Sequence, residues 1–294
     1  MITGTKTSLD DIPSFQNSDR IHDLLSNKER VIIGVAGGSA TGKSSAVSRE
    51  VLRWAEQQVI EGVEVRGVIL ALDNFQLGRQ FVRNSTSPYR WDDPENFDLP
   101  SVKCALKSIA AHGQAEVPTF SLSTVSRRDS RPFVAPQLTI LEGLYALHPD
   151  IFDCIDYGIY VETSLAGRVI RRVFRFLYEH KINEPVTAIR QCLTTVLAAH
   201  RDLVIPQRLA ADSVVAIPYS FEETARRFPV PPLSPQLERI VERRTAIAGD
   251  AAILLSFVGD APFFEVEHRS KLLLSIPLDK ELASIVRAVD WNEL

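Results

Sequence analysis

Short apolar segments alternate with amphipathic segments along most of this chain. Five short segments, rich in aliphatic and β-branched residues, are typical of buried strands: residues 31–35, 63–72, 138–141, 157–161 and 213–217. The segments between them predict helices over residues 45–60, 101–111, 165–178 and 186–203. Because strands alternate with helices, we expect an α/β fold in three layers, whose five-stranded sheet is mostly parallel.

The pattern changes on both sides of this α/β region. Residues 1–30 are polar and mixed, so we expect an N-terminal arm with one short helix near Ile21–Leu25. Residues 74–100 are rich in Asn, Asp, Pro and aromatic residues, which predicts a long functional loop. Beyond Pro218, a linker-like stretch is marked by Pro229, Pro231, Pro232 and Pro235.

The segment after these prolines has its own pattern. It predicts a charged helix over residues 236–246, two apolar segments over 251–258 and 271–276, and a last helix over 279–289. We therefore expect three parts: the arm, a main domain over 31–218 and a C-terminal extension over 219–294. The extension is either an appended α/β subdomain or an elaboration packed on the core.

Composition narrows the class of protein. The chain has 294 residues, of which 45% are hydrophobic and 24% charged, as in ordinary soluble globular proteins. Its net charge of −4 argues against a nucleic-acid binder that uses a broad basic face. No apolar run is long enough to cross a bilayer, and the N-terminal segment lacks the apolar core of a signal peptide. Three widely separated cysteines, Cys104, Cys154 and Cys192, are typical of reduced thiols in the cytoplasm.

A glycine-rich turn, GVAGGSATGKSS over residues 34–45, follows the first predicted strand. Gly37, Gly42, Lys43 and Ser44 fit the phosphate-binding pattern G-x-x-x-x-G-K-[ST]. Glycine adopts backbone angles closed to other residues, so successive N–H groups can surround an anion. The lysine supplies a point charge for phosphates, and the serine hydroxyl is a Mg²⁺ ligand. We expect ATP to be bound by Gly37, Gly38, Ser39, Ala40, Thr41, Gly42, Lys43, Ser44 and Ser45.

Two carboxylates follow other predicted strands. Asp73 comes just after strand 63–72, where it can accept a proton from an attacking hydroxyl or approach Mg²⁺ through water. Its alternative role is that of a turn-initiating aspartate. Glu142 ends strand 138–141, and a charge there needs a partner, which is either Mg²⁺ with its water shell or a salt bridge. Because ligands bind at the carboxyl ends of parallel strands, we expect both carboxylates near the glycine-rich loop.

A row of arginines lies in the predicted helix 165–178. The spacing of Arg168, Arg171, Arg172 and Arg175 places them on one helical face. Over a triphosphate they would neutralise the charge on the transferring group. The alternative is a solvated basic face with glutamate partners such as Glu162.

The order of these motifs resembles the uridine kinase and phosphoribulokinase family of P-loop kinases, over about residues 31–217. The family's loop, GxxGGSxSGK(S/T), is matched closely by residues 34–44, and its double glycine is more specific than the general P-loop. Its D-x-F-Y and E-G motifs correspond to Asp73–Gln76 and Glu142–Gly143. Its N-F-D-x-P, P-x-Y-D-F…H-S-R and P-x-K-x-x-A-D segments resemble residues 90–94, 118–127 and 206–212.

The resemblance implies a P-loop kinase fold and the transfer of phosphate from ATP, with Mg²⁺, to a hydroxyl of a small molecule. It implies catalytic roles for Asp73, Lys43, Arg172 and Arg175, with the two arginines in a lid near residues 168–185. It also implies a metal site at Ser44 and Glu142. It also implies an acceptor site formed by Asp73, Phe75, Asp92, Phe120 and Arg127. Kinases of this family often form dimers or tetramers, so a homo-oligomer is implied as well. From local sequence alone, Arg127 and Arg128 are equally well explained as substrate ligands or as loop charges.

Four positions depart from the family pattern. Gln76 and Phe120 replace tyrosines, Val125 replaces a histidine, and Phe176 replaces the aspartate after the second lid arginine. In the uridine kinases the first three positions help bind the pyrimidine nucleoside, so their loss should leave a pyrimidine poorly held. We therefore expect a kinase for a nucleoside, sugar or sugar phosphate other than uridine. Two alternatives stay open: an ATP-binding regulatory protein without kinase activity, and a P-loop hydrolase coupled to motion.

Overall fold

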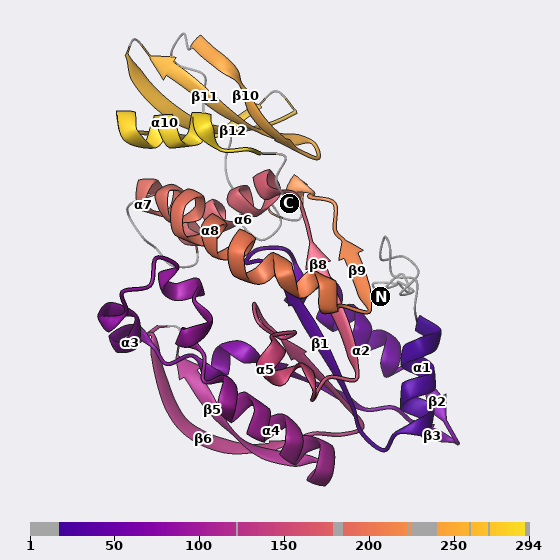
Figure 1. Cartoon of the computed structure of the whole chain (residues 1–294). Helices are drawn as coiled ribbons and strands as arrows, with labels where there is room; N and C mark the ends of the chain where they lie inside the picture. Colours follow the sequence, from indigo (N-terminus) through magenta and orange to yellow (C-terminus); the bar gives the residue numbers. More distant parts are fainter. Residues whose placement is uncertain are drawn as a thin grey trace. The chain divides into compact units, whose positions relative to one another are not determined.

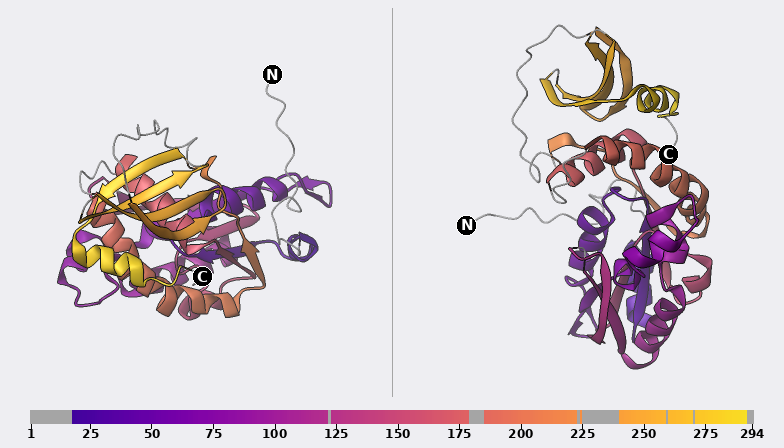
Figure 2. Two further views of the ribbon diagram at one scale, coloured as in Figure 1. Left: turned by 90° about the horizontal axis from the view of Figure 1, so that it is seen from above. Right: turned by 90° about the vertical axis from the view of Figure 1, so that its left-hand side faces the viewer.

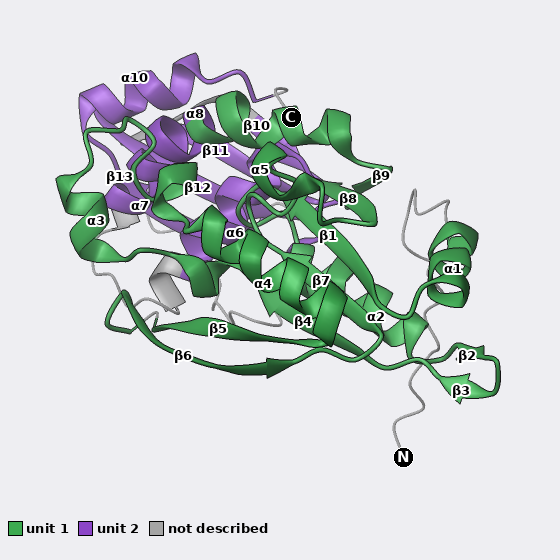
Figure 3. Ribbon diagram, turned by 60° about the horizontal axis from the view of Figure 1, so that its bottom comes forward, with its two compact units in different colours: residues 1–162, 199–217 green, residues 163–198, 218–294 purple. Residues whose placement is uncertain are grey.

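The computed structural model describes residues 18–121, 123–178, 185–222, 224, 240–258, 260–269 and 271–291 (Figure 1). The chain divides into two compact units, residues 1–162 with 199–217 and residues 163–198 with 218–294 (Figure 3). The helices of the expected lid therefore belong to the same unit as the C-terminal extension. Most of the expected arm and the prolines at 229–235 lie outside the described residues. Among the helices that are described, none has the length and apolarity needed to cross a membrane.

The first unit is built on a five-stranded sheet in which all neighbouring strands are parallel. In spatial order the strands are β4 (Gly67–Ala71), β7 (Leu138–Glu142), β1 (Val31–Gly37), β8 (Tyr157–Glu162) and β9 (Ser213–Ala216) (Figure 3). All five expected strands are present, although the second begins at Gly67 rather than at residue 63. The expected α/β class with a mostly parallel sheet is thus confirmed.

Helices cover both faces of this sheet. Successive residues of β1 point to opposite faces, so they belong to two different apolar clusters. Val31, Ile33 and Val35 belong to an apolar cluster with α1 (Ser18–Asn27) and α2 (Arg49–Ala55). Ile32 and Ala36 belong to a second cluster with α4 (Leu99–His112) and α5 (Pro149–Phe152). This confirms the three layers, and α1 is the helix expected near Ile21–Leu25.

The expected helix over residues 45–60 is too long. A π-helical turn, Lys43–Ser48, leads into α2, which ends at Ala55. The next residues form a small hairpin of β2 (Val59–Ile60) and β3 (Val63–Glu64). Its two turn residues, Glu61 and Gly62, have φ angles of 51° and 83°, which suit a two-residue hairpin and exclude a helix.

The long loop after β4 contains short helical elements. These are 3₁₀ turns at Leu72–Phe75, Arg90–Asp92 and Pro94–Asn96, and helix α3 (Arg79–Asn84). A longer hairpin, β5 (Gln114–Ser121) and β6 (Ser126–Val134), follows α4 and was not expected from the sequence. Helix α4 contacts β5, and the two lie along each other in Figures 1 and 3.

The second unit combines helices with a four-stranded antiparallel sheet. Its strands pair in chain order: β10 (Ile240–Ala248), β11 (Ala251–Val258), β12 (Ala261–His268) and β13 (Lys271–Pro277). Figure 2 shows this curved sheet, in orange to yellow, with helix α10 (Lys280–Ala288) beside it. One apolar cluster joins the sheet and α10 to α6 (Leu165–Tyr178) and α7 (Pro185–Gln191). The expected helices over 165–178 and 279–289 are confirmed, while 186–203 is helical in several pieces that include α8 (Leu197–Ala199).

The expected helix over residues 236–246 is wrong. Residues 240–248 form strand β10, which pairs antiparallel with β11 from Ile240 and Phe257 to Ala248 and Ala251. Gly249, with φ 56°, begins the tight turn that folds one strand back on the other. A charged stretch suits an exposed helix as well as an exposed strand, so its composition could not reveal this pairing. Residues 236–239 lie outside the described part of the chain.

Candidate active site

The glycine-rich loop leaves the carboxyl end of β1, whose seven residues are all buried. Gly37 and Gly42 have φ angles of 145° and 101°, both in the region that favours glycine. A Cβ atom at Gly37 would lie 2.3 Å from the backbone oxygen of Val161 on β8. The loop therefore needs glycine where it passes close to β8 and again where it turns into the helix.

The side chain of Lys43 lies back across this loop. Its Nζ donates hydrogen bonds to the carbonyl oxygens of Gly37, at 2.8 Å, and Gly38, at 2.7 Å. The hydroxyl of Thr41 donates to the same Gly38 oxygen at 2.9 Å. The positive charge is thus held at the loop itself, as the predicted phosphate-binding role requires.

Ser44 and Glu142, the two predicted metal ligands, are in direct contact. The Ser44 hydroxyl donates a hydrogen bond of 2.8 Å to Oε1 of Glu142. Glu142 is the last residue of β7, where it lies in register with Val35 of β1 on one side and Ala71 of β4 on the other. The order of strands therefore brings together two residues that are 98 positions apart in the sequence.

This pair has the donors that a magnesium ion requires. Mg²⁺ binds hydroxyl and carboxylate oxygens and keeps several of its water ligands. Oε2 of Glu142 is buried and lacks a hydrogen-bond partner among the described residues. Such an oxygen is costly to leave without a partner, and a cation bound at the exposed Ser44 hydroxyl would supply one. The residues present therefore fit a bound Mg²⁺.

Asp73 lies on the other side of Glu142 from the loop. It belongs to the 3₁₀ turn that follows β4, two residues after Ala71, and it is exposed. Its Oδ1 accepts a hydrogen bond of 2.9 Å from Nε2 of Gln76. A Cβ atom on Gly143 would lie 2.4 Å from Cβ of Leu72, so this glycine lets the turn before Asp73 pack directly against the end of β7.

Asp92 is positioned by a tyrosine that follows the Glu142–Gly143 motif. The hydroxyl of Tyr145 donates to the backbone oxygen of Asp92, and the Tyr145 ring meets Phe97 edge-on at 5.4 Å between centroids. Burial, followed by the carboxylates of Asp92 and Asp93, raises the pKa of Tyr145 far above its ordinary value. The phenol therefore stays protonated and remains a donor.

Arg127 and Phe120 face each other in the β5–β6 hairpin, and Arg127 is engaged by a carboxylate. Its Nη1 lies 2.7 Å from Oδ2 of Asp98. The same Oδ2 accepts a hydrogen bond from the hydroxyl of Ser101 at the start of α4, and Oδ1 accepts one from the Ser101 backbone N–H. Burial raises the pKa of Asp98, but the hydrogen bonds from Arg127 and Ser101 outweigh burial and hold it below its usual range. Arg127 is thus fixed to α4 while about a third of its side chain, 30%, stays exposed.

Phe75 differs from the other predicted acceptor residues. Its side chain has no exposed surface and belongs to the core cluster that includes Phe97 and Tyr145. A fully buried ring offers no surface to a small molecule, so the structure favours a packing role for Phe75.

The predicted lid arginines lie in the second unit. Arg172 and Arg175 are on helix α6 and are half-buried, whereas Arg168 on the same face is buried. Glu162, the alternative partner expected for this row, lies in the first unit, where its Oε2 is 3.0 Å from Nε of Arg208. Phosphate binding by Arg172 and Arg175 remains a prediction.

Three residues at the site were missed or given no role by sequence reasoning. Gln76 was noticed only as a departure from the D-x-F-Y pattern, although it binds Asp73. Asp98 precedes Leu99-Pro100-Ser101, a signature of a helix N-cap that was available in the sequence. Tyr145 carried no local signal, because its partner is the backbone of a residue in another loop.

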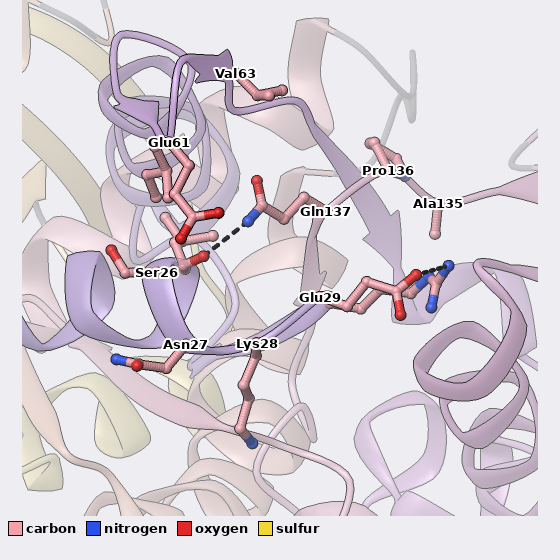
Figure 4. A pocket seen from close by; sticks show the side chains of 12 residues that line it. Ser26, Asn27, Lys28, Glu29, Glu61, Val63, Ala135, Pro136 and Gln137 are labelled. Carbon is pink, nitrogen blue, oxygen red and sulfur yellow. Dashed lines mark hydrogen bonds and ion pairs between the residues drawn. The ribbon is translucent and has the colours of Figure 1, made fainter.

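A separate cavity of about 570 Å³ lies at the other end of the sheet (Figure 4). It is lined by residues just before β1 and β7, including Lys28, Glu29 and Pro136. There Nε2 of Gln137 donates to the backbone oxygen of Leu25 at 2.8 Å. Ligands of parallel α/β sheets bind at the carboxyl ends of the strands, so this cavity is not the predicted nucleotide site.

Comparison with known proteins now decides the family. Residues 32–218 match the Phosphoribulokinase / Uridine kinase family. The chain belongs to this family. Strands β10–β13 lie outside the matched residues, whereas helices α6 and α7 lie within them.

Curated relatives agree with this membership, and a solved structure shares the fold. The chain is 27% identical over 191 residues to the uridine kinase of Clostridium tetani (strain Massachusetts / E88), covering 64% of this chain and 88% of that protein. It is 26% identical over 202 residues to uridine-cytidine kinase 2-B of Danio rerio, covering 67% and 77%. A structure described as a proposed fructose transport system kinase, from Silicibacter sp. TM1040, has a TM-score of 0.53 at 20% identity over 65% of this chain and 90% of that one. At this identity the structural likeness shows a shared fold, that of the P-loop kinases.

Proposed function

We propose that this family member is an ATP- and Mg²⁺-dependent kinase that transfers the γ-phosphate to a hydroxyl of a small molecule other than uridine. The acceptor is a nucleoside, a sugar or a sugar phosphate. This proposal rests on the carboxyl ends of three adjacent strands. The glycine-rich loop follows β1, Glu142 at the end of β7 contacts Ser44, and Asp73 follows β4. Family membership and the kinase relatives support the same class of reaction.

In the proposed reaction the side chains have separate tasks. Asp73 accepts the proton of the acceptor hydroxyl as its oxygen forms a bond to the γ-phosphorus and the bond from phosphorus to the leaving ADP oxygen breaks. Lys43, Arg172 and Arg175 offset the charge on the transferring phosphoryl group. Mg²⁺, held by Ser44 and Glu142, would supply charge neutralisation at the phosphate oxygens.

The acceptor side supports a substrate other than a pyrimidine nucleoside. Gln76, in the place of the family's tyrosine, is hydrogen-bonded to Asp73, and Arg127 is paired with Asp98. Phe120 offers an apolar, half-buried surface where a tyrosine would offer a hydroxyl. A pyrimidine base would leave polar atoms unmatched here, which discriminates strongly against it.

A screen of acceptors tests the proposal. ADP release from MgATP is followed with nucleosides, pentoses, pentose phosphates, glycerate and pantothenate, using the wild type and the Asp73→Asn variant. We expect one acceptor class to stimulate ADP release, and Asp73→Asn to lower that rate by about 10²–10⁴-fold while ATP binding measured by calorimetry is retained. If ATP binds but none of the acceptors stimulates ADP release, the proposal is wrong.

That negative result would favour the second candidate, an ATP-binding regulatory protein. The observations behind it are the altered acceptor positions and the four-stranded sheet outside the family match. A regulatory protein would bind its partner equally well with Asp73→Asn, whereas a kinase needs that carboxylate for transfer.

We also propose a cytoplasmic location for the protein. Cys104, Cys154 and Cys192 form no disulfide with one another, which fits a reducing compartment. Because kinases of this family often form dimers or tetramers, we expect a homo-oligomer. Light scattering of the purified chain would test this.

A further inference from the structure

A short stretch of chain fastens helix α6 within the second unit. We call Tyr219–Glu222 the splice. The ring of Tyr219 packs on Gly167 of α6, where a Cβ atom would lie only 2.8 Å from two of the ring carbons. The guanidinium carbon of Arg171, one turn further along the helix, lies 5.1 Å from the centre of the same ring in a cation–π contact.

The same stretch also contacts the C-terminal sheet. A Cβ atom on Gly249, in the turn between β10 and β11, would lie 2.3 Å from the backbone oxygen of Tyr219. The ring of Phe221 contacts two other rings: that of Phe174 on α6, at 5.7 Å between centroids, and that of His268 at the end of β12, at 4.8 Å. Glu222 accepts a hydrogen bond of 3.1 Å from Arg269 beside that strand end. The splice therefore joins α6 to two turns of the sheet.

The core of the second unit also determines how α6 is rotated about its axis. Its apolar residues Leu165, Ala166, Val169, Ile170, Val173 and Phe174 are all buried, and all belong to the cluster that contains β11, β12 and β13. At 100° per residue, the arginines at 168, 171, 172 and 175 lie on the opposite side of the helix. Contact between α6 and the sheet thus sets the direction of the arginine row.

We propose that Tyr219 and Phe221 are positioning residues for Arg172 and Arg175, and that the C-terminal sheet is a working part of the lid. The catalytic part of this inference rests on the proposed kinase function, whereas the attachment of α6 rests only on the contacts of Tyr219 and Phe221 described above. The inference gives a role to β10–β13, which lie outside the family match.

Kinetics of full-length variants test the positioning role. Using the acceptor that the screen identifies, we expect Tyr219→Leu to lower kcat by about 10–100-fold with little change in KM for ATP, because a displaced lid fails at the transition state. Tyr219→Phe keeps the ring and should retain near-normal kcat. Ile247→Ala, on an exposed residue of β10, is the matched control.

A double-mutant cycle separates positioning from general damage. If Tyr219 acts through the arginines, Tyr219→Leu should cost little more in a chain that already carries Arg172→Gln and Arg175→Gln. If Tyr219→Leu lowers kcat by the same factor in that background as in the wild type, the positioning role is wrong, and the kinase proposal is unaffected.

Hydrogen exchange tests the fastening without any acceptor. In Tyr219→Leu we expect faster backbone exchange in α6 and in the turn between β10 and β11, with exchange of β1 and β7 unchanged. Unchanged exchange in α6 would overturn the inference. Faster exchange in α6, together with a failed acceptor screen, would support the fastening and tell against the kinase reaction.

Discussion

Glu142 ends β7 and Asp73 follows the neighbouring strand β4, yet their carboxylates have different surroundings. Glu142 is half-buried, with one oxygen bound to Ser44 and the other buried without a described partner. Asp73 is exposed, and the amide of Gln76 holds one of its oxygens. A buried oxygen suits a metal ion, whereas an exposed carboxylate with a defined orientation suits proton transfer to a small molecule.

Gln76 should therefore affect the rate of transfer rather than nucleotide binding. Replacing it with leucine removes the donor that orients Asp73, and we expect kcat to fall about tenfold with ATP affinity unchanged. Steady-state kinetics and calorimetry measure the two quantities. Gln58→Leu is the matched control, because the Gln58 amide binds the carbonyl of Trp54 at the end of α2. Equal kcat for the wild type and Gln76→Leu would show that the contact is incidental.

Glu142→Gln should weaken the use of Mg²⁺. The amide keeps the shape of the side chain but removes the charge, so we expect the Mg²⁺ concentration needed for half-maximal ATP binding to rise about 10–100-fold. Titration of Mg²⁺ at fixed ATP, followed by calorimetry, measures this value. Glu64→Gln, on an exposed residue of β3, should leave it unchanged. An unaltered Mg²⁺ requirement would remove Glu142 from the metal site.

Short motifs predicted that Ser44, Glu142 and Asp73 lie at or just after the carboxyl ends of strands, and the structure places them there. The sequence could not predict the partners of Gln76 or Tyr145, because those contacts join separate loops through the sheet. Phe75 shows the converse case: the motif implied a substrate contact, but the aromatic ring is part of the apolar core. Motifs specify which residues occur together, whereas burial depends on the whole fold.

Among the elements, the β5–β6 hairpin depends on helix α4 for its position. The Arg127–Asp98 ion pair joins β6 to the first turn of α4, and Asp98 is also the N-cap of that helix. One carboxylate therefore stabilises a helix terminus and holds a predicted acceptor residue.

Asp98→Asn should reveal this contribution through its pH dependence. Because the pKa of folded Asp98 is held below its ordinary value, the carboxylate stabilises the fold above pH about 4, and that contribution is lost as the pH falls further. Asparagine still caps the helix, so we expect a loss of about 1 kcal/mol at pH 7 that shrinks towards zero near pH 2. Urea unfolding at both values measures it, with Asp129→Asn on the exposed side of β6 as control. A loss of equal size at both pH values would contradict the assignment to charge.

Periodicity predicted the elements that are long or almost completely buried, such as α6 and β7. It failed for β10, because residues 240–248 carry a mixed pattern that becomes a strand only through pairing with β11. The β5–β6 hairpin was missed for a related reason, since most of β6 is exposed and offers little apolar alternation. Pairing between strands is a tertiary interaction that a local pattern does not contain.

At the scale of the whole molecule, the predicted nucleotide site and the C-terminal sheet belong to different units. The predicted ATP loop and Asp73 lie in the first unit, and the predicted lid arginines lie in the second. Neither unit is continuous in sequence, because residues 163–198 of the second unit are inserted before the last strand of the first.

MgATP should stabilise the chain through Lys43. At a nucleotide concentration about 100 times the Kd, we expect a gain of about 2.7 kcal/mol, or roughly 5–10 °C in the temperature of the affected transition. Lys43→Met should abolish most of this shift, because the charge at the phosphates is lost. Lys107→Met, on the exposed face of α4, should behave as the wild type in scanning calorimetry. A shift that survives in Lys43→Met would show that nucleotide binding does not use the loop.

The interrupted layout of the second unit has a consequence for its synthesis. The apolar stripe of α6 leaves the ribosome well before strands β10–β13, which cover it, have been translated. Since translation adds about 5–20 residues per second, the apolar side of α6 stays uncovered on the nascent chain for several seconds. The first unit is therefore synthesised in full before the strands that cover α6 exist, and until then the apolar side of this helix is open to aggregation.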